Sequence, residues 1–468
     1  MLIRRTELFG AGIADVRIDA GIVSAIGDLT ALPSEEVIDA AGGLLLPGLH
    51  DHHIHVAALA ASLTSVRCGP PDVNDAEAFA ARLRTSGTGW LRGIGYHESI
   101  AGMLDAATLD RFVTQRPVRL QHRSGRMWFF NSAGLELLLS HGDAPPGLER
   151  IDGRYTGRLF DEDAWLRRTL GSSPPSFAPV GSALARVGVT GLTEISPTND
   201  AAMGRHFMHE TRSGALPQRV LLAGSLSLSH GDTGGKVQLG PAKLHLHEAN
   251  LPDLDTATQF IRHAHDADRG VAIHCATEVE LVYALAALRD AGVKSGDRIE
   301  HASVAPDDAI EEIARLNLAV VTQPHFIRER GDAYRTDVEA ASQRLLYRQR
   351  AFLDAGVTLA GGSDAPFGHY DPWAAMAAAV DRRTQQGAII GASEALAPEE
   401  ALDLFLRVPD ALDRRRTIAV GVVADLCLLD RPWSRARSAL SSACVRATFV
   451  GGVRVFERDS EREPRKTA

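Results

Sequence analysis

The sequence has few cysteines and no long apolar run. Its 468 residues include four cysteines, Cys68, Cys275, Cys427 and Cys444, and none of them has CxxC spacing. Cysteines this few and this scattered exclude a disulfide framework. The polar start MLIRRTELFGAGIADVRID lacks the apolar stretch of a signal peptide, and no run approaches the roughly 18 apolar residues of a membrane span. We therefore expect a cytoplasmic protein with no membrane partner.

An excess of basic residues is also absent. The chain holds 50 Lys and Arg against 59 Asp and Glu, so its formal net charge is -9. Nucleic acid binding depends on clustered Lys and Arg that contact phosphates, and this balance argues against such a partner. Hydrophobic residues make up 45% and charged residues 23% of the chain, which is the range of ordinary globular domains. We expect a folded protein that binds no nucleic acid.

Two kinds of pattern divide the chain. Short β-like pieces separated by Gly or Asp turns occupy residues 1–47 and return in residues 417–458. Over residues 48–416, apolar strand-like runs alternate with helical stretches, as in repeated βα units around a parallel sheet. We predict an α/β protein with a TIM-like (β/α)8 barrel over residues 48–416 and a small composite β-sandwich domain from both chain ends. The charged tail, residues 459–468, is predicted to fray.

Nine strand-like runs compete for the eight strands of that barrel. The first precedes His53, and the others are TGWLRGIGY, RPVRLQH, VGVTGLTEI, PAKLHLH, GVAIHC, DRIEHA, LAVVTQP and VTLAGGSDA. One of the early runs is therefore an extra strand or no strand. The order still places GVAIHC, DRIEHA and VTLAGGSDA as strands five, six and eight.

Histidines and a carboxylate end several of these runs. His53 and His55 are two residues apart, so on a strand their side chains point to the same face and can reach one ion. His274, His301 and Asp364 end later runs. Because the C-terminal ends of barrel strands converge on one mouth, we expect these side chains to meet there. Each position alone also has a structural explanation, such as a buried histidine bonded to a carbonyl or an aspartate that caps a turn.

These motifs, in this order, resemble the amidohydrolase superfamily, and within it amidohydrolase family 3, the group of N-substituted formamide deformylase-like enzymes. The resemblance extends over nearly the whole chain and is carried by PGLHDHHIH, RPVRLQHRSGRMWFFNSAGL, GRYTGRLFDEDA, GVTGLTEI, GPAKLHLHE, VAIHCATE, RIEHASV, VTQPH and LLYRQRAFLDAGVTLAGGSDAPFGHYDPW. It implies one or two divalent ions, with zinc the expected metal. The ligands that it implies are His53, His55, Lys243, His274, His301 and Asp364.

Lys243, in GPAKLHLHE, is the strand-four ligand that the resemblance implies. An ammonium would repel a divalent cation, and in such enzymes the lysine is carboxylated by carbon dioxide so that its carbamate bridges two ions. The sequence departs from the family after this lysine, where His245, His247 and Glu248 replace the usual acidic residue and glycine. An exposed strand-edge lysine is the alternative, with Glu248 or His247 as the substitute ligand and a single-metal site.

The sequence departs from the family at a second place, in the region of the expected substrate pocket. Arg126, in SGRMW, stands where the family commonly has a histidine. Three roles are open for Arg126: it binds a carboxylate of the substrate, it polarises the substrate carbonyl, or it is a surface arginine. His122, which ends the run VRLQH, competes with it as a pocket residue. We also expect substrate contacts among His97, Trp128 and His325, although packing explains such side chains equally well.

The reaction that the resemblance implies is hydrolysis of a non-peptide C–N bond in a small molecule, such as a linear amide, an N-acyl compound or a formamide. A bound divalent ion lowers the pKa of its water to about 7, so hydroxide is available at neutral pH. The resemblance assigns Asp364 to orient this water and carry its proton to the leaving nitrogen. We expect His301, His325 or Arg126 to help the metal stabilise the oxyanion. Alternatives are a cyclic-amide hydrolase or deaminase, or a non-catalytic scaffold. A homodimer is expected from the resemblance alone.

Overall fold

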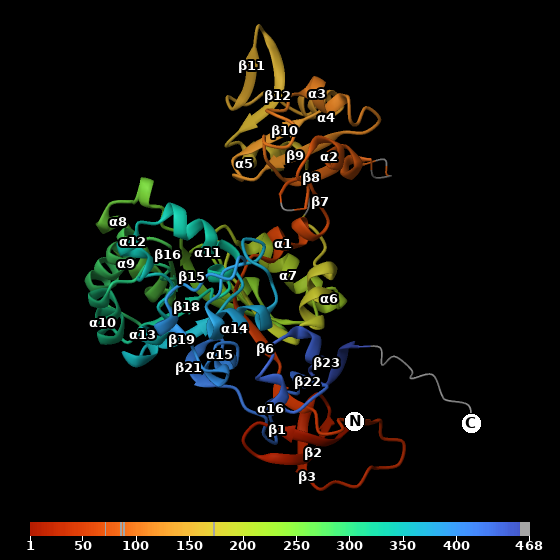
Figure 1. Cartoon of the computed structure of the whole chain (residues 1–468), viewed down its shortest axis with the longest axis vertical. Helices are drawn as coiled ribbons and strands as arrows, with labels where there is room; N and C mark the ends of the chain where they lie inside the picture. The colour runs from red at the N-terminus through yellow and green to blue at the C-terminus, as the bar shows by residue number, and fades with distance from the viewer. Residues whose placement is uncertain (71, 85–86, 88, 172–173, 459–468) are drawn as a thin grey trace. The chain divides into compact units, whose positions relative to one another are not determined.

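The chain divides into two compact units. A computed structural model (Figure 1) describes residues 1–70, 72–84, 87, 89–171 and 174–458. The first unit comprises Met1–Ala58 and Ser176–Ala468, and the second comprises Leu59–Pro175. The predicted fraying tail, residues 459–468, lies outside the described residues. In the described part of the chain, no helix has the length and apolar character needed to cross a membrane.

Eight parallel strands form a nearly closed barrel in the first unit, which confirms the predicted α/β class and TIM-like barrel. An isolated parallel bridge between Ile54 and Ala365 joins the end of the first strand to the segment after the last strand. The strands are almost continuously buried, as expected for a parallel sheet that helices cover. In order around the barrel they are β6 (Leu49–Ile54), β13 (Val189–Glu194), β14 (Arg219–Gly224), β15 (Val237–Leu244), β16 (Val271–Cys275), β17 (Arg298–His301), β18 (Ala319–Thr322) and β19 (Thr358–Gly361).

Helices that connect these strands lie around the barrel (Figure 1). A capping box starts α9 directly after β16, because Thr277 Oγ1 accepts from the Glu280 backbone N–H and the Glu280 carboxylate accepts from the Thr277 backbone N–H. This cap fixes the end of β16, the strand that carries His274. The helices are α1 (Val56–Leu63), α6 (Ala178–Arg186), α7 (Ala201–Ser213), α8 (Leu254–Asp266), α9 (Glu278–Ala291), α10 (Asp307–Arg315), α11 (Phe326–Asp337), α12 (Ala340–Gln343), α13 (Gln349–Asp354), α14 (Pro372–Asp381) and α15 (Pro398–Asp403).

Both chain ends combine in one β structure, as the sequence predicted, and this structure is a single mixed sheet. In Figure 1 the red N-terminal strands adjoin the blue C-terminal strands, and β5 pairs antiparallel with β22, with Leu46 opposite Cys427. A core that includes Ile3, Val16 and Phe449 lies against this sheet. Its order is β24 (Val453–Glu457), β23 (Val445–Val450), β22 (Leu426–Leu429), β5 (Leu44–Pro47), β1 (Leu2–Leu8), β2 (Gly12–Asp19) and β3 (Ile22–Gly27), and β4 (Val37–Asp39) pairs with β1.

The second unit holds a separate mixed sheet. Its order is β11 (Leu148–Ile151), β12 (Arg154–Phe160), β10 (Met127–Phe130), β9 (Val118–His122), β8 (Leu91–Tyr96) and β7 (Val66–Arg67). Its helices are α2 (Ala76–Leu83), α3 (Ala106–Asp110), α4 (Ser132–Leu139) and α5 (Asp163–Thr169).

The sequence predicted that one early run lies outside the barrel, but two do. TGWLRGIGY and RPVRLQH form β8 and β9 of the second unit. The third barrel strand is instead RVLLAG, β14, which the sequence prediction omitted. An apolar run indicates a buried strand but carries no information about the sheet to which that strand belongs.

Shorter elements complete the first unit. The hairpin of β20 (Arg407–Val408) and β21 (Ala411–Arg415) packs Leu412 against Val321 and Ala360 of the barrel. The others are α16 (Trp433–Ala436) and the 3-10 helices η1 (His230–Asp232), η2 (Glu248–Asn250), η3 (Ala392–Glu394) and η4 (Ser442–Cys444).

Candidate metal centre

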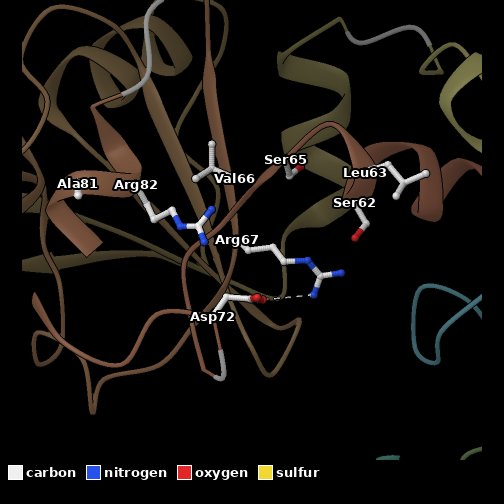
Figure 2. Close-up of a pocket in the computed structure, with 8 residues that line it drawn as sticks. All are labelled: Ser62, Leu63, Ser65, Val66, Arg67, Asp72, Ala81 and Arg82. Atoms are coloured by element: carbon white, nitrogen blue, oxygen red, sulfur yellow. Dashed lines mark ion pairs between the residues drawn. The ribbon is translucent and has the colours of Figure 1, made fainter. Parts of the chain in front are cut away.

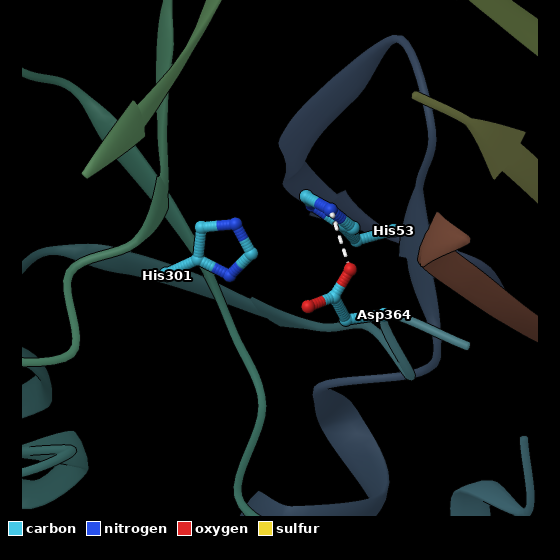
Figure 3. A group of neighbouring side chains, drawn as sticks. All are labelled: His53, His301 and Asp364. Atoms are coloured by element: carbon cyan, nitrogen blue, oxygen red, sulfur yellow. Dashed lines mark ion pairs between the residues drawn. The ribbon is translucent and has the colours of Figure 1, made fainter. Parts of the chain in front are cut away.

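Three buried side chains meet where the barrel closes. His53 lies in β6, His301 ends β17, and Asp364 follows β19. One ligand atom from each of them lies within 4.8 Å of the others (Figure 3). Nε2 of His53 is 3.3 Å from Oδ1 of Asp364. The carboxyl ends of the barrel strands thus bring together residues that are distant in sequence.

His55 and His274 extend this group. Nε2 of His55 is 3.3 Å from the same Oδ1 of Asp364. The ring centre of His274 lies 4.5 Å from that of His301, and the rings of His53 and His301 are 4.6 Å apart. The structure therefore gathers the four histidines and the aspartate that the sequence singled out as candidate ligands.

Hydrogen bonds hold two of these imidazoles at Nδ1. Nδ1 of His53 lies 2.5 Å from Oε2 of Glu300, and Nδ1 of His301 lies 2.7 Å from Oε1 of Gln323. Both partners are acceptors, so the proton of a neutral ring belongs on Nδ1 and leaves a lone pair on Nε2. Imidazole ligands of metal ions are commonly oriented in this way. Similarly, Nδ1 of His55 lies 2.9 Å from Oγ of Ser196.

The backbone around these side chains is strained and tightly packed. His301 has φ of 70° and Asp364 has φ of 50°, a left-handed conformation that costs a residue other than glycine about 1–3 kcal/mol. The backbone N–H of Asp364 donates to the carbonyl of His53 at 2.7 Å. The buried carboxylate of Asp51 accepts from the backbone N–H groups of His53 and Ser363 at 3.1 and 2.9 Å. The two ends of the barrel sheet are thus joined at the site itself.

Lys243 lies on β15, the neighbour of the strand β16 that carries His274, and is buried, with 4% of its surface exposed. The alternative of an exposed strand-edge lysine is therefore wrong. Among the described residues its Nζ has no hydrogen-bond partner. Burial, opposed in part by the charge of Glu300, lowers the pKa of Lys243 to about 8. Part of this amine is therefore neutral near physiological pH, and only the neutral amine can react with carbon dioxide.

The three polar residues after Lys243 are more exposed. The ring of His245 lies 4.5 Å from that of His274, on the side of the predicted ligands. His247 caps η2 by accepting from the Ala249 backbone N–H at 3.3 Å. Glu248 lies on the surface, and its backbone N–H donates to Glu280. His245 is thus the member of this segment that contacts a predicted ligand.

Burial and charge together prepare the site to hold a cation. Burial, with the charge of His53, lowers the pKa of His301 to about 3, and burial and His301 lower the pKa of His274. Burial also opposes protonation of His53, but the Glu300 and Asp364 carboxylates outweigh it and raise the pKa of His53. Burial would raise the pKa of Asp364, but contacts with His53 and His55 hold it well below its ordinary value. His301 and His274 are therefore neutral imidazoles, and with the Asp364 carboxylate they form a donor set that fits zinc, whereas His53 must give up a proton to bind it.

Among the expected substrate contacts, His325 belongs to the first unit. It is buried, and its Nε2 donates to the carbonyl of Ser363 at 3.0 Å. His325 therefore supports the turn that carries Asp364. Its predicted contact with substrate stays a prediction.

The other four expected substrate contacts lie in the second unit. Arg126 forms an ion pair with Asp161, and 76% of its side chain is exposed. The ring of His122 stacks with that of His97 at 6.1 Å between centres. Trp128 is buried and donates from Nε1 to Asp163 at 2.9 Å. Contact of these four residues with substrate also stays a prediction.

The second unit also has a pocket of about 450 Å³ near the exposed ion pair of Arg67 and Asp72 (Figure 2). Their closest charged atoms are 3.8 Å apart. Arg82 and Val66 are among the residues that line the pocket (Figure 2). No residue that the sequence singled out lines it, so the pocket adds nothing to the predicted site.

Sequence reasoning did not identify several residues that contact the predicted ligands. Glu300, Gln323 and Ser196 hydrogen-bond to histidines, and the ring of Phe367 lies 5.6 Å from that of His55 with 59% of the residue exposed. Glu300 could have been identified from the sequence, because a carboxylate inside a short buried strand requires a partner. Arg298, two residues before it, points to the same face of the strand and is that partner.

Comparisons with known proteins identify the family and the fold of the chain. Residues 36–456 match the amidohydrolase family. N-substituted formamide deformylase of Arthrobacter pascens is 28% identical over 95% of each chain, and the putative amidohydrolase YtcJ of Bacillus subtilis is 25% identical over 95% of this chain and 96% of its own. The crystal structure of an uncharacterized metal-dependent hydrolase of Pyrococcus horikoshii shares the fold, with a TM-score of 0.76 and 20% identity over 92% of this chain and 97% of that one.

Proposed function

The chain belongs to the amidohydrolase family, and we propose that it is a metal-dependent hydrolase of a non-peptide C–N bond in a linear amide, an N-acyl compound or a formamide. The observation that carries the proposal is the convergence of His53, His301 and Asp364 at the mouth of the barrel. The 28% identity of the whole chain to the N-substituted formamide deformylase of Arthrobacter pascens supports the choice of bond.

The residues present fit a divalent ion, with zinc the expected metal. His53, His55, His274, His301 and Asp364 would hold it, since they offer imidazole nitrogens and a carboxylate in a buried group. When bound, the ion would acidify a water molecule and polarise the scissile carbonyl.

Lys243 would join the ligands after carboxylation. Its neutral Nζ attacks carbon dioxide, a C–N bond forms, and the amine loses a proton to give a carbamate with one negative charge. This reaction replaces the neutral amine with an anion beside the other ligands. The unpartnered Nζ and the depressed pKa of Lys243, about 8, support this step and with it a site for two ions.

Asp364 would act as the proton carrier. Its contacts with His53 and His55 hold its pKa well below the ordinary value, so it is a carboxylate at neutral pH and can accept a proton from the attacking water. The protonated carboxyl then donates to the leaving nitrogen, and the starting state returns. Gln323 accepts from Nδ1 of His301 and leaves a lone pair on Nε2, which favours the role of ligand for His301 over that of oxyanion donor.

The experiment that tests this function measures hydrolysis of a substrate panel before and after removal of metal. The panel contains N-formyl and N-acetyl amines, a cyclic amide and an amino-substituted ring. We expect turnover of a linear amide or formamide that a chelator abolishes and zinc restores. His53→Ala should abolish it, whereas His265→Ala, a histidine that pairs with Asp297 at 3.0 Å, should not.

Two results would count against the proposal. Turnover of only the cyclic amide or the amino-substituted ring would favour the alternative of a cyclic-amide hydrolase or deaminase. Turnover that persists in metal-free protein would contradict the metal-dependent mechanism.

A further inference from the structure

A buried ion pair lies directly behind the candidate metal ligands. Glu300, on β17 next to His301, is completely buried, and Arg298 on the same strand is 2% exposed. Nε of Arg298 donates to Oε1 of Glu300 at 2.7 Å. Removing two such charges from water is costly, so their pairing alone gives no clear gain in stability. A buried pair of this kind calls for another explanation.

The pair contacts both the side chain and the main chain of the strand that carries His53. Oε2 of Glu300 lies 2.5 Å from Nδ1 of His53. Arg298 also donates from Nη2 to the carbonyl of His52 at 3.3 Å. One carboxylate oxygen therefore faces the imidazole and the other faces the guanidinium. The carboxylate cannot rotate without losing one of these contacts.

This geometry has a chemical consequence for His53. A carboxylate that accepts the Nδ1–H proton selects the tautomer whose lone pair is on Nε2, the atom that faces Asp364. It also orients the ring and makes Nε2 a stronger donor to a cation. Arg298 offsets the charge of Glu300, so the ion pair adds no net charge next to His53. His301 differs, because its Nδ1 faces the neutral amide of Gln323.

We propose that Glu300, held by Arg298, is the positioning residue that fixes the tautomer and orientation of His53 for binding a divalent ion. The inference rests on the proposed function, because it assigns Glu300 a role toward the ion that this function requires. Neither Glu300 nor Arg298 touches substrate or is itself a ligand. The role is distinct from that of Asp364, which lies on the opposite side of His53 and contacts Nε2.

The test compares zinc affinity and the His53 tautomer in variants of the full chain. Glu300→Gln keeps the size of the side chain but loses its charge, and we expect zinc to bind about 10- to 100-fold more weakly in competition with a chromogenic chelator. Asp297→Asn is the matched control, since Asp297 is also completely buried and pairs with a histidine, His265, outside the site. The control should bind zinc with unchanged affinity.

Nitrogen NMR of the metal-free protein supplies a second readout that needs neither zinc nor turnover. In spectra recorded at alkaline pH, where the ring is neutral, His53 of the wild type should carry its proton on Nδ1, and in Glu300→Gln the two tautomers should mix. If Glu300→Gln does not fold, Arg298→Met/Glu300→Gln removes both charges and leaves neither unpaired. We expect the same weaker zinc binding from this double variant.

The outcomes separate the two proposals. If the wild type binds zinc and both variants match its affinity and tautomer, the positioning role is overturned and the proposed function stands. If the wild type binds no zinc, the proposed function fails, and the tautomer measurement alone decides the role of Glu300. A Glu300→Gln protein with weaker zinc binding but an unchanged His53 tautomer also contradicts the mechanism stated for Glu300.

Discussion

Oδ1 of Asp364 lies 3.3 Å from Nε2 of His53, and the backbone N–H of Asp364 donates to the carbonyl of His53 at 2.7 Å. His53 belongs to the first barrel strand, and Asp364 follows the last. The same two residues therefore join the ends of the barrel sheet and form the centre of the candidate site. Any change that separates these strands should also disturb metal binding.

Gly362→Ala should separate them. A Cβ at Gly362 would lie 2.4 Å from Cβ of His53 and 2.7 Å from its backbone nitrogen, so the strands must move apart. We expect a loss of about 1–3 kcal/mol in the free energy of unfolding, together with weaker zinc binding. Gly142→Ala is the control, because a Cβ there meets no atom within 4 Å. Urea unfolding of both variants measures the effect. If Gly362→Ala is as stable as Gly142→Ala, the contact between Gly362 and His53 tolerates a methyl group.

Asp364→Asn should remove the proton carrier while keeping its shape. Loss of a positioned general acid and base reduces rates by about 10²- to 10⁴-fold, and we expect a fall of this size in kcat at saturating zinc. The zinc content of the variant, measured alongside, separates loss of proton transfer from loss of a ligand. A kcat within a few-fold of the wild type, with zinc retained, would transfer the proton-carrying role to another group.

The buried amine of Lys243 should affect stability above pH 8. Its pKa of about 8 in the folded protein lies below the roughly 10.4 of an unfolded chain. Between these values the unfolded state binds the proton and the folded state does not, so the stability of metal-free protein should rise with pH in this window. We expect a gain on the order of 3 kcal/mol over Lys243→Met, measured by urea unfolding from pH 7.5 to 10.5.

The control for this measurement is Lys294→Met, because Lys294 is partly exposed and pairs with Asp268. Its stability should follow the wild-type pH profile in shape. Parallel profiles for the wild type and Lys243→Met would mean that Lys243 keeps its proton throughout this range.

Phe367→Ala should change the preference among substrates. The ring lies 5.6 Å from that of His55 and 59% of the residue is exposed, so it offers an apolar surface beside the candidate ligands. We expect KM for substrates with bulky apolar N-substituents to rise about 10-fold, in keeping with the loss of part of a 1.5–3 kcal/mol contact, and KM for small ones to change little. Ile151→Ala, also exposed at 53%, is the control. Equal effects on all substrates would assign Phe367 a role in packing.

Much of the fold follows from patterns in the sequence. The runs that end at His274 and His301 become β16 and β17 because β-branched, apolar segments between helices form buried parallel strands. The inserted sheet does not follow from such patterns, because TGWLRGIGY and RPVRLQH have the same apolar character as barrel strands. RVLLAG was not predicted as a barrel strand because it ends in Gly224, and no histidine or carboxylate marks its end.

The site could be predicted to the level of its candidate ligands. Alternation along a strand places His53 and His55 on one face, and barrel geometry predicts that residues after different strands meet. The partners at Nδ1 could not be assigned in this way. Whether Glu300 or another carboxylate reaches His53 depends on strand register and on the buried Arg298, which only the folded structure defines.

The most direct test of the account is the metal content of the purified protein, measured by inductively coupled plasma mass spectrometry beside His53→Ala and Lys243→Ala. We expect about two equivalents of zinc per chain with a carbamate on Lys243, a lower content in Lys243→Ala and a loss of metal in His53→Ala. One equivalent that does not depend on Lys243 would restrict the site to a single ion. Protein that carries no metal after expression in zinc-supplemented medium would contradict the central claim.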